Sequence, residues 1–178
     1  MDELILVDEE DNELGTEEKV KCHLGEGMLH RAFSVFVFNN KNELLLQQRG
    51  KEKLLWPLYW SNTCCSHPRK NEDYIVAAER RLKEEMVFSC PLRFIGKFQY
   101  QAPYKNIGAE NELCAVLIGV YNGSVVANPK EAEEWQWVGL KNLLNDVNKN
   151  PEKYTPWFKI ELEKFNKEFK KFLTYEIL

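Results

Sequence analysis

The stretch from Ser66 to Phe88, SHPRKNEDYIVAAERRLKEEMVF, decides how this chain folds. Asn71 is a residue type that begins helices, and the acidic residues Glu72 and Asp73 after it suit a first helical turn. Apolar residues then recur at helical spacing on one face: Ile75, Ala78, Leu82 and Met86. Oppositely charged pairs four residues apart occupy another face: Arg80 with Glu84, and Arg81 with Glu85. The pattern predicts a helix that runs to about Met86.

Strand-like segments lie on both sides of this helix. Before it, residues 32–38 are aromatic and β-branched, residues 39–42 form a turn and residues 43–48 return as a second strand, which predicts a hairpin. Residues 50–66 show no period and predict a long functional loop. Further strands are expected at four places: Leu4–Val7, Leu92–Tyr100, Glu112–Tyr121 and Trp135–Val138.

The C-terminal part has the pattern of an amphipathic helix. Aromatic and aliphatic residues recur at steps of four and three: Phe158, Leu162, Phe165, Phe169 and Phe172. We expect one helix over residues 156–173, packed on the core, with dimerisation through its apolar stripe as the alternative. The order of strands and helices indicates an α+β fold, a sandwich built on a mixed sheet, and one domain over residues 1–178.

Composition excludes several classes of function. The chain has 178 residues, 44% of them hydrophobic, which fits one domain with a real core. A net charge of -4 argues against a nucleic-acid-binding surface. The apolar runs are far shorter than the roughly 20 residues of a membrane span. Five cysteines, an odd number, follow an acidic start without a leader pattern, so we expect reduced thiols and a cytoplasmic protein.

All three histidines of the chain lie where they could share one metal ion. His23 and His30 lie near the N-terminus, and His67 closes a long motif. Alternation along a strand places Glu110 and Glu112 on one face. This set of imidazoles and carboxylates suits Mg²⁺, Mn²⁺ or Zn²⁺. Each histidine alone is better explained as an ordinary surface or core residue, and spacing alone does not bring the three segments together.

The Ser66–Phe88 stretch also has a spacing known from phosphate chemistry. Glu72, Arg80, Leu82 and the pair Glu84–Glu85 resemble the Nudix box, a loop–helix–loop that holds Mg²⁺ against a diphosphate. The match is degenerate at three positions: Ser66 and Val87 replace glycines, and Arg81 replaces a glutamate. An arginine at that position favours diphosphate binding over diphosphate hydrolysis, because it can contact phosphate oxygens. The alternative is a solvated, salt-bridged helix face.

Several motifs together resemble one family, the type I isopentenyl diphosphate isomerases. They are His30-Arg31-Ala32-Phe33-Ser34, Gln48-Arg49 with Trp56-Pro57, Trp60-Ser61-Asn62-Thr63-Cys64-Cys65-Ser66-His67-Pro68, the box-like stretch, and Glu110-Asn111-Glu112. The resemblance covers about residues 3 to 160 and includes Thr155-Pro156-Trp157. It implies a Nudix-type α/β/α sandwich and an enzyme of isoprenoid precursor biosynthesis. Such an enzyme interconverts isopentenyl and dimethylallyl diphosphate through a tertiary carbocation.

The resemblance also implies roles for particular residues. Cys65 and Glu112 match the two groups that flank the reacting double bond, and Tyr100 and Trp157 match aromatic residues lining the pocket. The metal ligands match His23, His30, His67, Glu110 and Glu112. A second ion, Mg²⁺, would arrive with the diphosphate and bind Glu85 and the backbone carbonyl of Cys65. The diphosphate contacts match Lys19, Arg49, Lys53 and Arg81.

General chemistry is consistent with these roles. Protonating an unactivated alkene and deprotonating the resulting cation requires an acid and a base on opposite faces of a dry pocket. We expect Glu112 with Tyr100 on one face and Cys65 on the other, whereas Cys64 would point away and be structural. The cation would be attracted to the π face of Trp157.

Two other functions remain open from the sequence: a Nudix hydrolase of nucleoside diphosphates, and a non-catalytic diphosphate-binding module. The partner is expected to be a small prenyl diphosphate, with no nucleic acid and no membrane, and the chain a monomer or weak homodimer.

Overall fold

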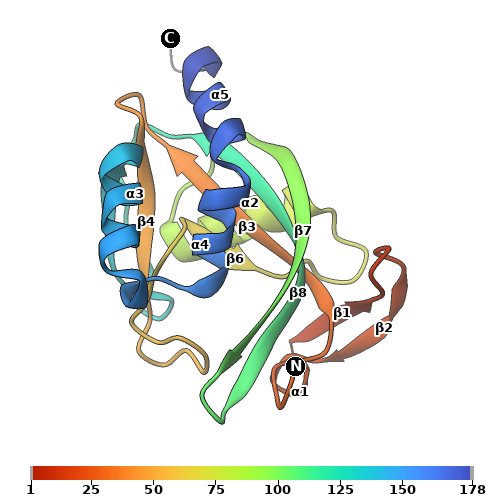
Figure 1. Cartoon of the computed structure of the whole chain (residues 1–178). Helices are drawn as coiled ribbons and strands as arrows, with labels where there is room; N and C mark the ends of the chain where they lie inside the picture. The colour runs from red at the N-terminus through yellow and green to blue at the C-terminus, as the bar shows by residue number, and fades with distance from the viewer. Residues whose placement is uncertain (1, 177–178) are drawn as a thin grey trace.

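A computed structural model of the chain describes residues 2–176. In chain order its elements are β1 (Glu3–Val7), β2 (Glu13–Glu18), α1 (Lys19–Cys22), β3 (His30–Phe38), β4 (Glu43–Arg49), β5 (Trp60–Ser61), β6 (Cys64–Ser66), α2 (Tyr74–Met86), β7 (Leu92–Tyr104), β8 (Gly108–Val120), β9 (Ala132–Gly139), α3 (Leu140–Lys149), η1 (Pro151–Lys153), α4 (Pro156–Lys164) and α5 (Asn166–Glu176) (Figure 1). Within the described residues, no helix is long and apolar enough to cross a membrane.

The described strands form one nine-stranded mixed sheet around β3. β3 runs parallel to β8 along its whole length, from His30 opposite Glu112 to Phe38 opposite Val120. β7 and β8 form a long antiparallel hairpin in which Tyr100 also lies opposite Glu112. β6 pairs with β3 on its other side, and β4 pairs with β5 and β9. Because side chains alternate between the two faces of a strand, this register decides which groups meet.

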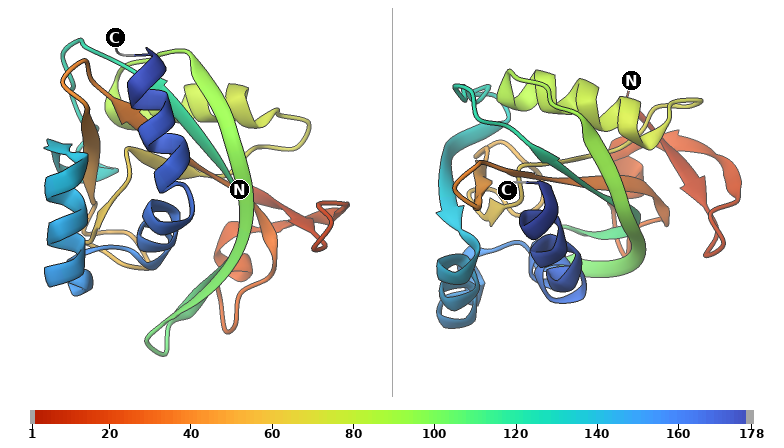
Figure 2. Two further views of the ribbon diagram at one scale, coloured as in Figure 1. Left: turned by 45° about the horizontal axis from the view of Figure 1, so that its top comes forward. Right: turned by 90° about the horizontal axis from the view of Figure 1, so that it is seen from above.

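Helices cover both faces of the sheet, which makes the fold a three-layered α+β sandwich. The right-hand view of Figure 2 shows α2 on one side and α3, α4 and α5 on the other. Alternate residues of β3 serve the two layers: Phe33, Val35 and Val37 pack with α2, while Phe36 and Phe38 pack with α4 and α5. The sandwich and its mixed sheet agree with the fold class predicted from the sequence.

The helix α2 follows the predicted apolar stripe but begins later than predicted. Its N-cap is Asp73, whose carboxylate accepts a hydrogen bond of 2.8 Å from the backbone N–H of Ile75. Asn71, the predicted cap, instead has a φ of 64° in the turn before the helix. The helix ends at Val87, which has left-handed φ and ψ of 56° and 26°. Glycine is the usual residue at such a helix end.

The C-terminal stripe forms two helices instead of the single one predicted. α4 and α5 meet at Phe165, whose φ of −104° and ψ of 13° leave the helical region. The bend lets the ring of Phe165 lie on Gly96, where a Cβ would come within 2.4 Å of it. Phe158, Leu162, Phe169 and Phe172 are buried, so the stripe is used in the core.

Three further sequence predictions needed correction. β3 and β4 pair only at Phe38 and Leu44, so the predicted hairpin opens after its turn. The predicted loop from residue 50 to 66 contains the strands β5 and β6. The elements β2, α1 and α3 were not predicted; β2 has few apolar residues, and α1 has only four residues in all.

Candidate active site

One pocket gathers most of the predicted site residues. It is a cavity of about 160 Å³ between α1, the loop after β4, β6, α2, the β7–β8 hairpin and α4. The predicted residues that line it are Lys19, His23, Arg49, Lys53, Cys65, His67, Arg81, Tyr100, Glu110, Glu112 and Trp157. His30 and Glu85 are not part of the lining, and they are buried, with 0% and 2% of their surface exposed. Residues from opposite ends of the sequence therefore share one cavity.

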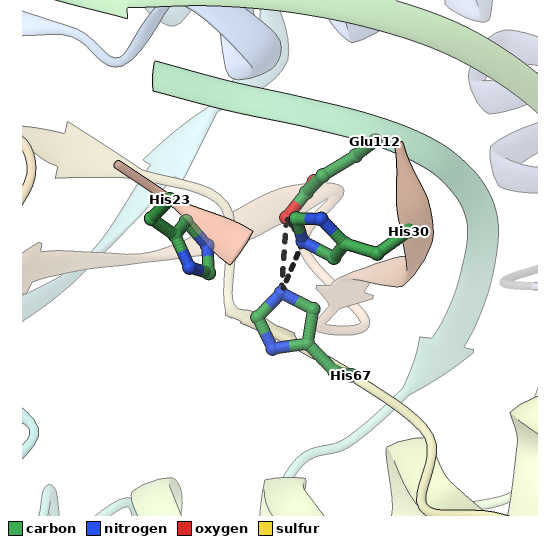
Figure 3. Close-up of side chains that lie close together, drawn as sticks. All are labelled: His23, His30, His67 and Glu112. Carbon is green, nitrogen blue, oxygen red and sulfur yellow. Dashed lines mark hydrogen bonds and ion pairs between the residues drawn. The ribbon is translucent and has the colours of Figure 1, made fainter. Parts of the chain in front are cut away.

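The three histidines and Glu112 converge from four segments: the residue after α1, the start of β3, the residue after β6, and β8 (Figure 3). The Nε2 atoms of His30 and His67 are 3.2 Å apart. Oε1 of Glu112 lies 3.1 Å from Nε2 of His67 and 3.6 Å from Nε2 of His30. The potential ligand atoms of His23, His30, His67 and Glu112 all lie within 4.8 Å of one another. Four such atoms at this separation form a cluster of the size that one ion fills.

Backbone carbonyls hold the Nδ1 atoms of two of the three histidines. Nδ1 of His23 lies 2.6 Å from the carbonyl oxygen of Lys19, and Nδ1 of His30 lies 2.7 Å from that of Met28. A carbonyl only accepts hydrogen bonds, so Nδ1 carries a proton, and in the neutral ring Nε2 is left with the lone pair that a metal needs. The tautomer of both rings is thus fixed by the backbone in the form that binds a metal.

Glu110 and His67 are consistent with the same interpretation. Oε2 of Glu110 is 3.0 Å from Nε2 of His23, yet this buried oxygen accepts no hydrogen bond within residues 2–176. Burial, together with nearby His30 and Lys19, holds the pKa of His67 well below its usual range, so the ring is neutral. The residues present therefore fit a divalent cation, with Glu110 beside His23 at the edge of the cluster.

Glu112 is held as an oriented carboxylate. The hydroxyl of Tyr100 donates a hydrogen bond of 2.6 Å to its Oε2. Burial raises the pKa of Glu112, but the contacts with His30 and Tyr100 outweigh burial, and the net pKa is lowered. Burial, with Glu112 next to it, keeps the pKa of Tyr100 well above its usual range. Tyr100 is therefore a neutral donor, and Glu112 is a charged acceptor.

Cys65 is held as a neutral thiol beside the indole of Trp157. Its Sγ donates to Oδ1 of Asn62 at 2.8 Å and accepts from Nε1 of Trp157 at 3.2 Å. Burial, reinforced by the nearby Glu161, raises the pKa of Cys65 to about 12. The hydroxyl of Ser34 lies 3.5 Å from the same sulfur. The pocket thus contains an un-ionised thiol and an ionised carboxylate.

Cys64 faces the opposite side of the sheet, as predicted for the neighbour of Cys65 in a strand. It is fully buried and packs in the cluster formed by α2 and one face of β3. Because successive side chains of β6 point to opposite faces, only Cys65 reaches the pocket.

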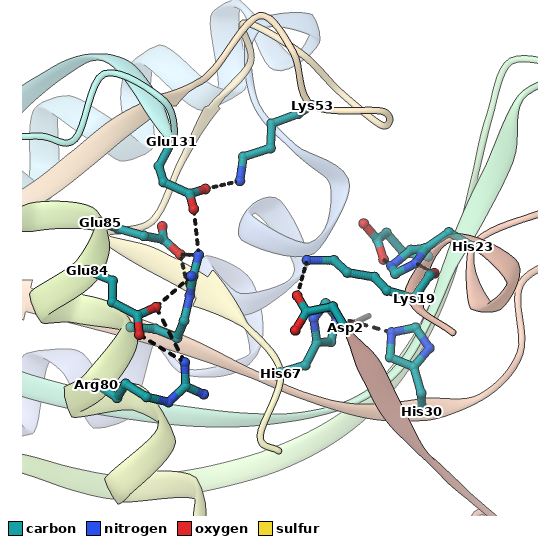
Figure 4. Close-up of polar contacts among 12 residues, drawn as sticks. Asp2, Lys19, His23, His30, Lys53, His67, Arg80, Glu84, Glu85 and Glu131 are labelled. Atoms are coloured by element: carbon teal, nitrogen blue, oxygen red, sulfur yellow. Dashed lines mark hydrogen bonds and ion pairs between the residues drawn. The ribbon is translucent and has the colours of Figure 1, made fainter. Parts of the chain in front are cut away.

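The predicted diphosphate-binding cations have partners of their own (Figure 4). Arg81 binds Glu84 at 2.7 Å, Glu85 at 2.6 Å and Glu131 at 3.0 Å, and Lys53 binds Glu131. Arg49 donates to the carbonyls of Leu55 and Trp56 and lies over the ring of Trp157, 5.0 Å from its centroid. Lys19 lies 3.8 Å from Asp2 at the pocket mouth.

Four residues at or near the site were missed by the sequence analysis. Asn62, Ser34 and Glu161 surround Cys65, and Glu131 joins two of the cations. Asn62 and Ser34 lie within motifs already singled out, so their motifs were the available signal. Glu131 stands in a charged stretch that looks like an ordinary exposed surface. Glu161 lies three residues after Phe158 and four before Phe165, on the predicted apolar face, so its spacing was the available signal.

The chain is similar to known proteins over most of its length. Residues 28–158 match the family described as NUDIX domain. The "Isopentenyl-diphosphate Delta-isomerase 1" of Photorhabdus laumondii is 44% identical over 163 residues, which cover 90% of this chain and 93% of that protein. The "Isopentenyl-diphosphate Delta-isomerase 1" of Aromatoleum aromaticum is 47% identical over 156 residues, which cover 88% of each.

Solved structures show the same fold at low sequence identity. The MutT protein from Methanosarcina mazei superposes with a TM-score of 0.66 at 19% identity, over 80% of this chain and 96% of that one. A MutT NUDIX hydrolase from Burkholderia pseudomallei gives 0.62 at 16% identity, over 77% and 98%. At these identities the likeness concerns the fold alone.

Proposed function

The chain belongs to the isopentenyl-diphosphate Delta-isomerases within the NUDIX family, and we propose that its isomerase reaction takes place between Cys65 and Glu112. The enzyme interconverts isopentenyl and dimethylallyl diphosphate, a step of isoprenoid precursor biosynthesis. The reaction adds a proton to one carbon of an allylic unit and removes one from another carbon. It therefore needs a proton donor and a proton acceptor that reach the same flat group.

The observation that carries the proposal is that Cys65 and Glu112 line one cavity, the thiol with a raised pKa and the carboxyl group with a lowered one. The thiol is neutral and the carboxylate is charged, so one can give a proton while the other takes one. Tyr100 fixes the carboxylate, and Asn62 and Trp157 fix the sulfur. Because the reaction is reversible, the two groups exchange roles with its direction.

Aromatic groups supply the wall of the reaction chamber. The rings of Tyr100 and Trp157 lie 6.3 Å apart between centroids, and Trp56 meets Trp157 edge-on at 5.4 Å. Electron-rich ring faces attract a carbocation, and the apolar wall keeps water from trapping it as an alcohol. The binding energy of the diphosphate, remote from these rings, can hold the hydrocarbon end between them.

We assign the divalent ion to the His and Glu cluster. His23, His30, His67, Glu110 and Glu112 would hold it, and the ion is Mn²⁺, Mg²⁺ or Zn²⁺ by the chemistry of its donors. When bound, the ion supplies positive charge that keeps Glu112 ionised and oriented. The hydroxyl of Tyr100 also orients Glu112, through its hydrogen bond to the other carboxylate oxygen.

The diphosphate is assigned to the cations at the pocket mouth. Lys19, Arg49, Lys53 and Arg81 line the cavity together. Mg²⁺ would accompany the diphosphate and bind Glu85 and the backbone carbonyl of Cys65. Arg81 occupies the position of a metal-binding glutamate in the Nudix box, and it replaces a negative charge with a phosphate-binding one. This substitution supports isomerisation, in which the diphosphate stays intact.

The chain is proposed to work in the cytoplasm as a monomer or weak homodimer. The apolar stripe of the C-terminal helices, the predicted dimer contact, is buried within the chain itself, since Phe169 and Phe172 are only 0% and 5% exposed. This burial favours the monomer.

The test is incubation with isopentenyl diphosphate and Mg²⁺ in heavy water, followed by NMR. Deuterium should enter the substrate carbons as dimethylallyl diphosphate forms. In Cys65→Ala and Glu112→Gln, incorporation should fall by at least about 10²-fold, since each removes one proton carrier. Near-normal turnover in either variant would remove that residue from the chemistry. Release of phosphate from nucleotides without isomerisation would instead indicate a hydrolase.

A further inference from the structure

Glu131 joins the two elements that present cations to the pocket. One carboxylate oxygen binds Nζ of Lys53, and the other lies 3.0 Å from Nη2 of Arg81 (Figure 4). Lys53 comes from the loop after β4, whereas Arg81 comes from α2. Burial alone would raise the pKa of Glu131, but the bond from Lys53 and the charge of Arg81 outweigh it, so the group is a carboxylate. The proposed proton transfers make no use of this residue.

The backbone around Glu131 is fastened to the same two elements. Its carbonyl oxygen accepts a hydrogen bond of 2.9 Å from the N–H of Gly50, at the start of the Lys53 loop. A Cβ at Gly50 would lie 3.0 Å from that oxygen, so the close approach suits glycine. Asn128 donates its backbone N–H to the carbonyl of Glu85 at 2.7 Å, at the end of α2. Glu131 is therefore a fixed point between the loop and the helix.

Lys53 and Arg81 both need a fixed partner to keep their side chains in place. A lysine side chain has many rotamers to lose when it is held in one place, and Lys53 lies in a loop whose neighbour Leu54 is 49% exposed. Arg81 has competing carboxylates on its own helix, Glu84 and Glu85. Without Glu131, Lys53 loses the only ion-pair partner recorded for it within residues 2–176, and Arg81 is pulled toward the helix.

We propose that Glu131 is a positioning residue that holds Lys53 and Arg81 side by side as one docking point for the Mg²⁺–diphosphate group. The inference rests on the proposed function and extends it to a residue without contact to the reacting carbons. Glu131 would act on diphosphate affinity and leave the proton transfers at Cys65 and Glu112 unchanged. Holding the cations before the ligand arrives reduces the ordering that binding must impose.

The negative charge of Glu131 also repels phosphate, and this opposing effect is the smaller one. Glu131 is already paired with two cations, which screen it from the ligand. Mg²⁺ also cancels most of the charge of a prenyl diphosphate, so the repulsion acts on a weakly charged complex. Removing Glu131 should therefore weaken binding.

The test compares the wild type with Glu131→Gln and with the matched control Glu134→Gln, which changes an exposed glutamate of β9, the strand that begins directly after Glu131. Titration calorimetry with inorganic diphosphate in excess Mg²⁺ should show a Kd about five- to tenfold higher in Glu131→Gln and unchanged in Glu134→Gln. The KM for isopentenyl diphosphate should rise by the same factor, while kcat stays within about twofold. In Lys53→Met, adding Glu131→Gln should cost less than it does alone, because the two residues act as a unit.

The outcomes separate this inference from the proposed function. Unchanged diphosphate affinity in Glu131→Gln would overturn it, and tighter binding would show that Glu131 competes with phosphate for the cations. A fall in kcat at constant KM would place the residue in the chemistry and equally refute a positioning role. If the wild type neither binds Mg²⁺–diphosphate nor isomerises the substrate, the proposed function is wrong, whatever the result for Glu131→Gln.

Discussion

Replacing Glu161 by glutamine should change how the stability of the fold depends on pH. Glu161 projects from α4 into the core with 0% exposure, and its Oε2 has no hydrogen-bond partner among residues 2–176. Its other oxygen lies 3.7 Å from Sγ of Cys114. Burial raises the pKa of Glu161 well above its usual range; Ser34 lowers it less, and Glu112 adds to the rise. The folded protein therefore holds this carboxyl group in its neutral form.

The sign and size of the effect follow from linkage. The unfolded chain releases the proton near pH 4.3, whereas the folded chain keeps it, so the folded state loses stability as the pH rises between the two pKa values. The slope for one proton is about 1.4 kcal/mol per pH unit. Glu161→Gln keeps the shape and polarity of the side chain without the proton. Relative to the wild type, the variant should gain stability as the pH rises, by about 1.4 kcal/mol for each pH unit over which the folded chain keeps the proton.

The assay is urea denaturation at about pH 5.5, 6.5 and 7.5. Metal-free protein is used, because the charge of Glu112 contributes to the pKa of Glu161. Glu163→Gln, at an exposed position of the same helix, provides the control and should run parallel to the wild type. If wild type and Glu161→Gln lose stability in parallel, Glu161 ionises normally in the fold and the reasoning is wrong.

Three further outcomes are expected. Val87→Gly should raise the free energy of unfolding by about 0.5–1 kcal/mol, because Val87 is 57% exposed and has a left-handed φ of 56° that glycine adopts freely. A loss of stability in thermal melts would show that the backbone at Val87 is not strained. Tyr100→Phe removes the 2.6 Å hydrogen bond that lowers the pKa of Glu112, so the acidic limb of the kcat/KM profile should move to higher pH, and an unmoved limb would contradict this. Chelation should lower the Tm by roughly 5–10 °C if the ion is held about 100-fold above its Kd; His67→Ala should abolish this difference, and an unaffected wild-type Tm would argue against a bound ion.

The accuracy of the sequence analysis depended on how local each signal is. The apolar stripe of α2 and its end near Met86 could be predicted because both depend on residues within a few turns. The start was misplaced by two residues, since Asn71 and Asp73 are both good caps and only the turn geometry chooses between them. The hairpin of β3 and β4 was wrong beyond its turn because β6, a segment distant in sequence, pairs with Phe33, Ser34 and Val35 on that edge of β3. α3 was missed although Leu140, Leu143 and Val147 have helical spacing.

In the candidate site, too, the residues with local signals could be predicted, and those that depend on distant contacts could not. The motifs and the resemblance they carry named the histidines, the two glutamates, Cys65 and the cations. They could not reveal Glu131 or Glu161, whose roles come from contacts with distant segments. An acidic residue in a charged stretch is normally a solvated surface group, and only burial in the fold separates Glu131 from its neighbours, whereas Glu161 lies in step with Phe158 and Phe165.

Strand register explains why Glu112 can serve both the metal cluster and the proton chemistry. β3 places His30 opposite Glu112 on one side, and β7 places Tyr100 opposite it on the other. One carboxylate oxygen therefore faces the histidines and the other faces the tyrosine hydroxyl. Glu110, two residues away, shares the face, whereas Asn111 between them points back and donates to the carbonyl of Gly27. A shift of one residue in either pairing would exchange these faces and separate Glu112 from the histidines, so the sheet register is what the proposed chemistry depends on.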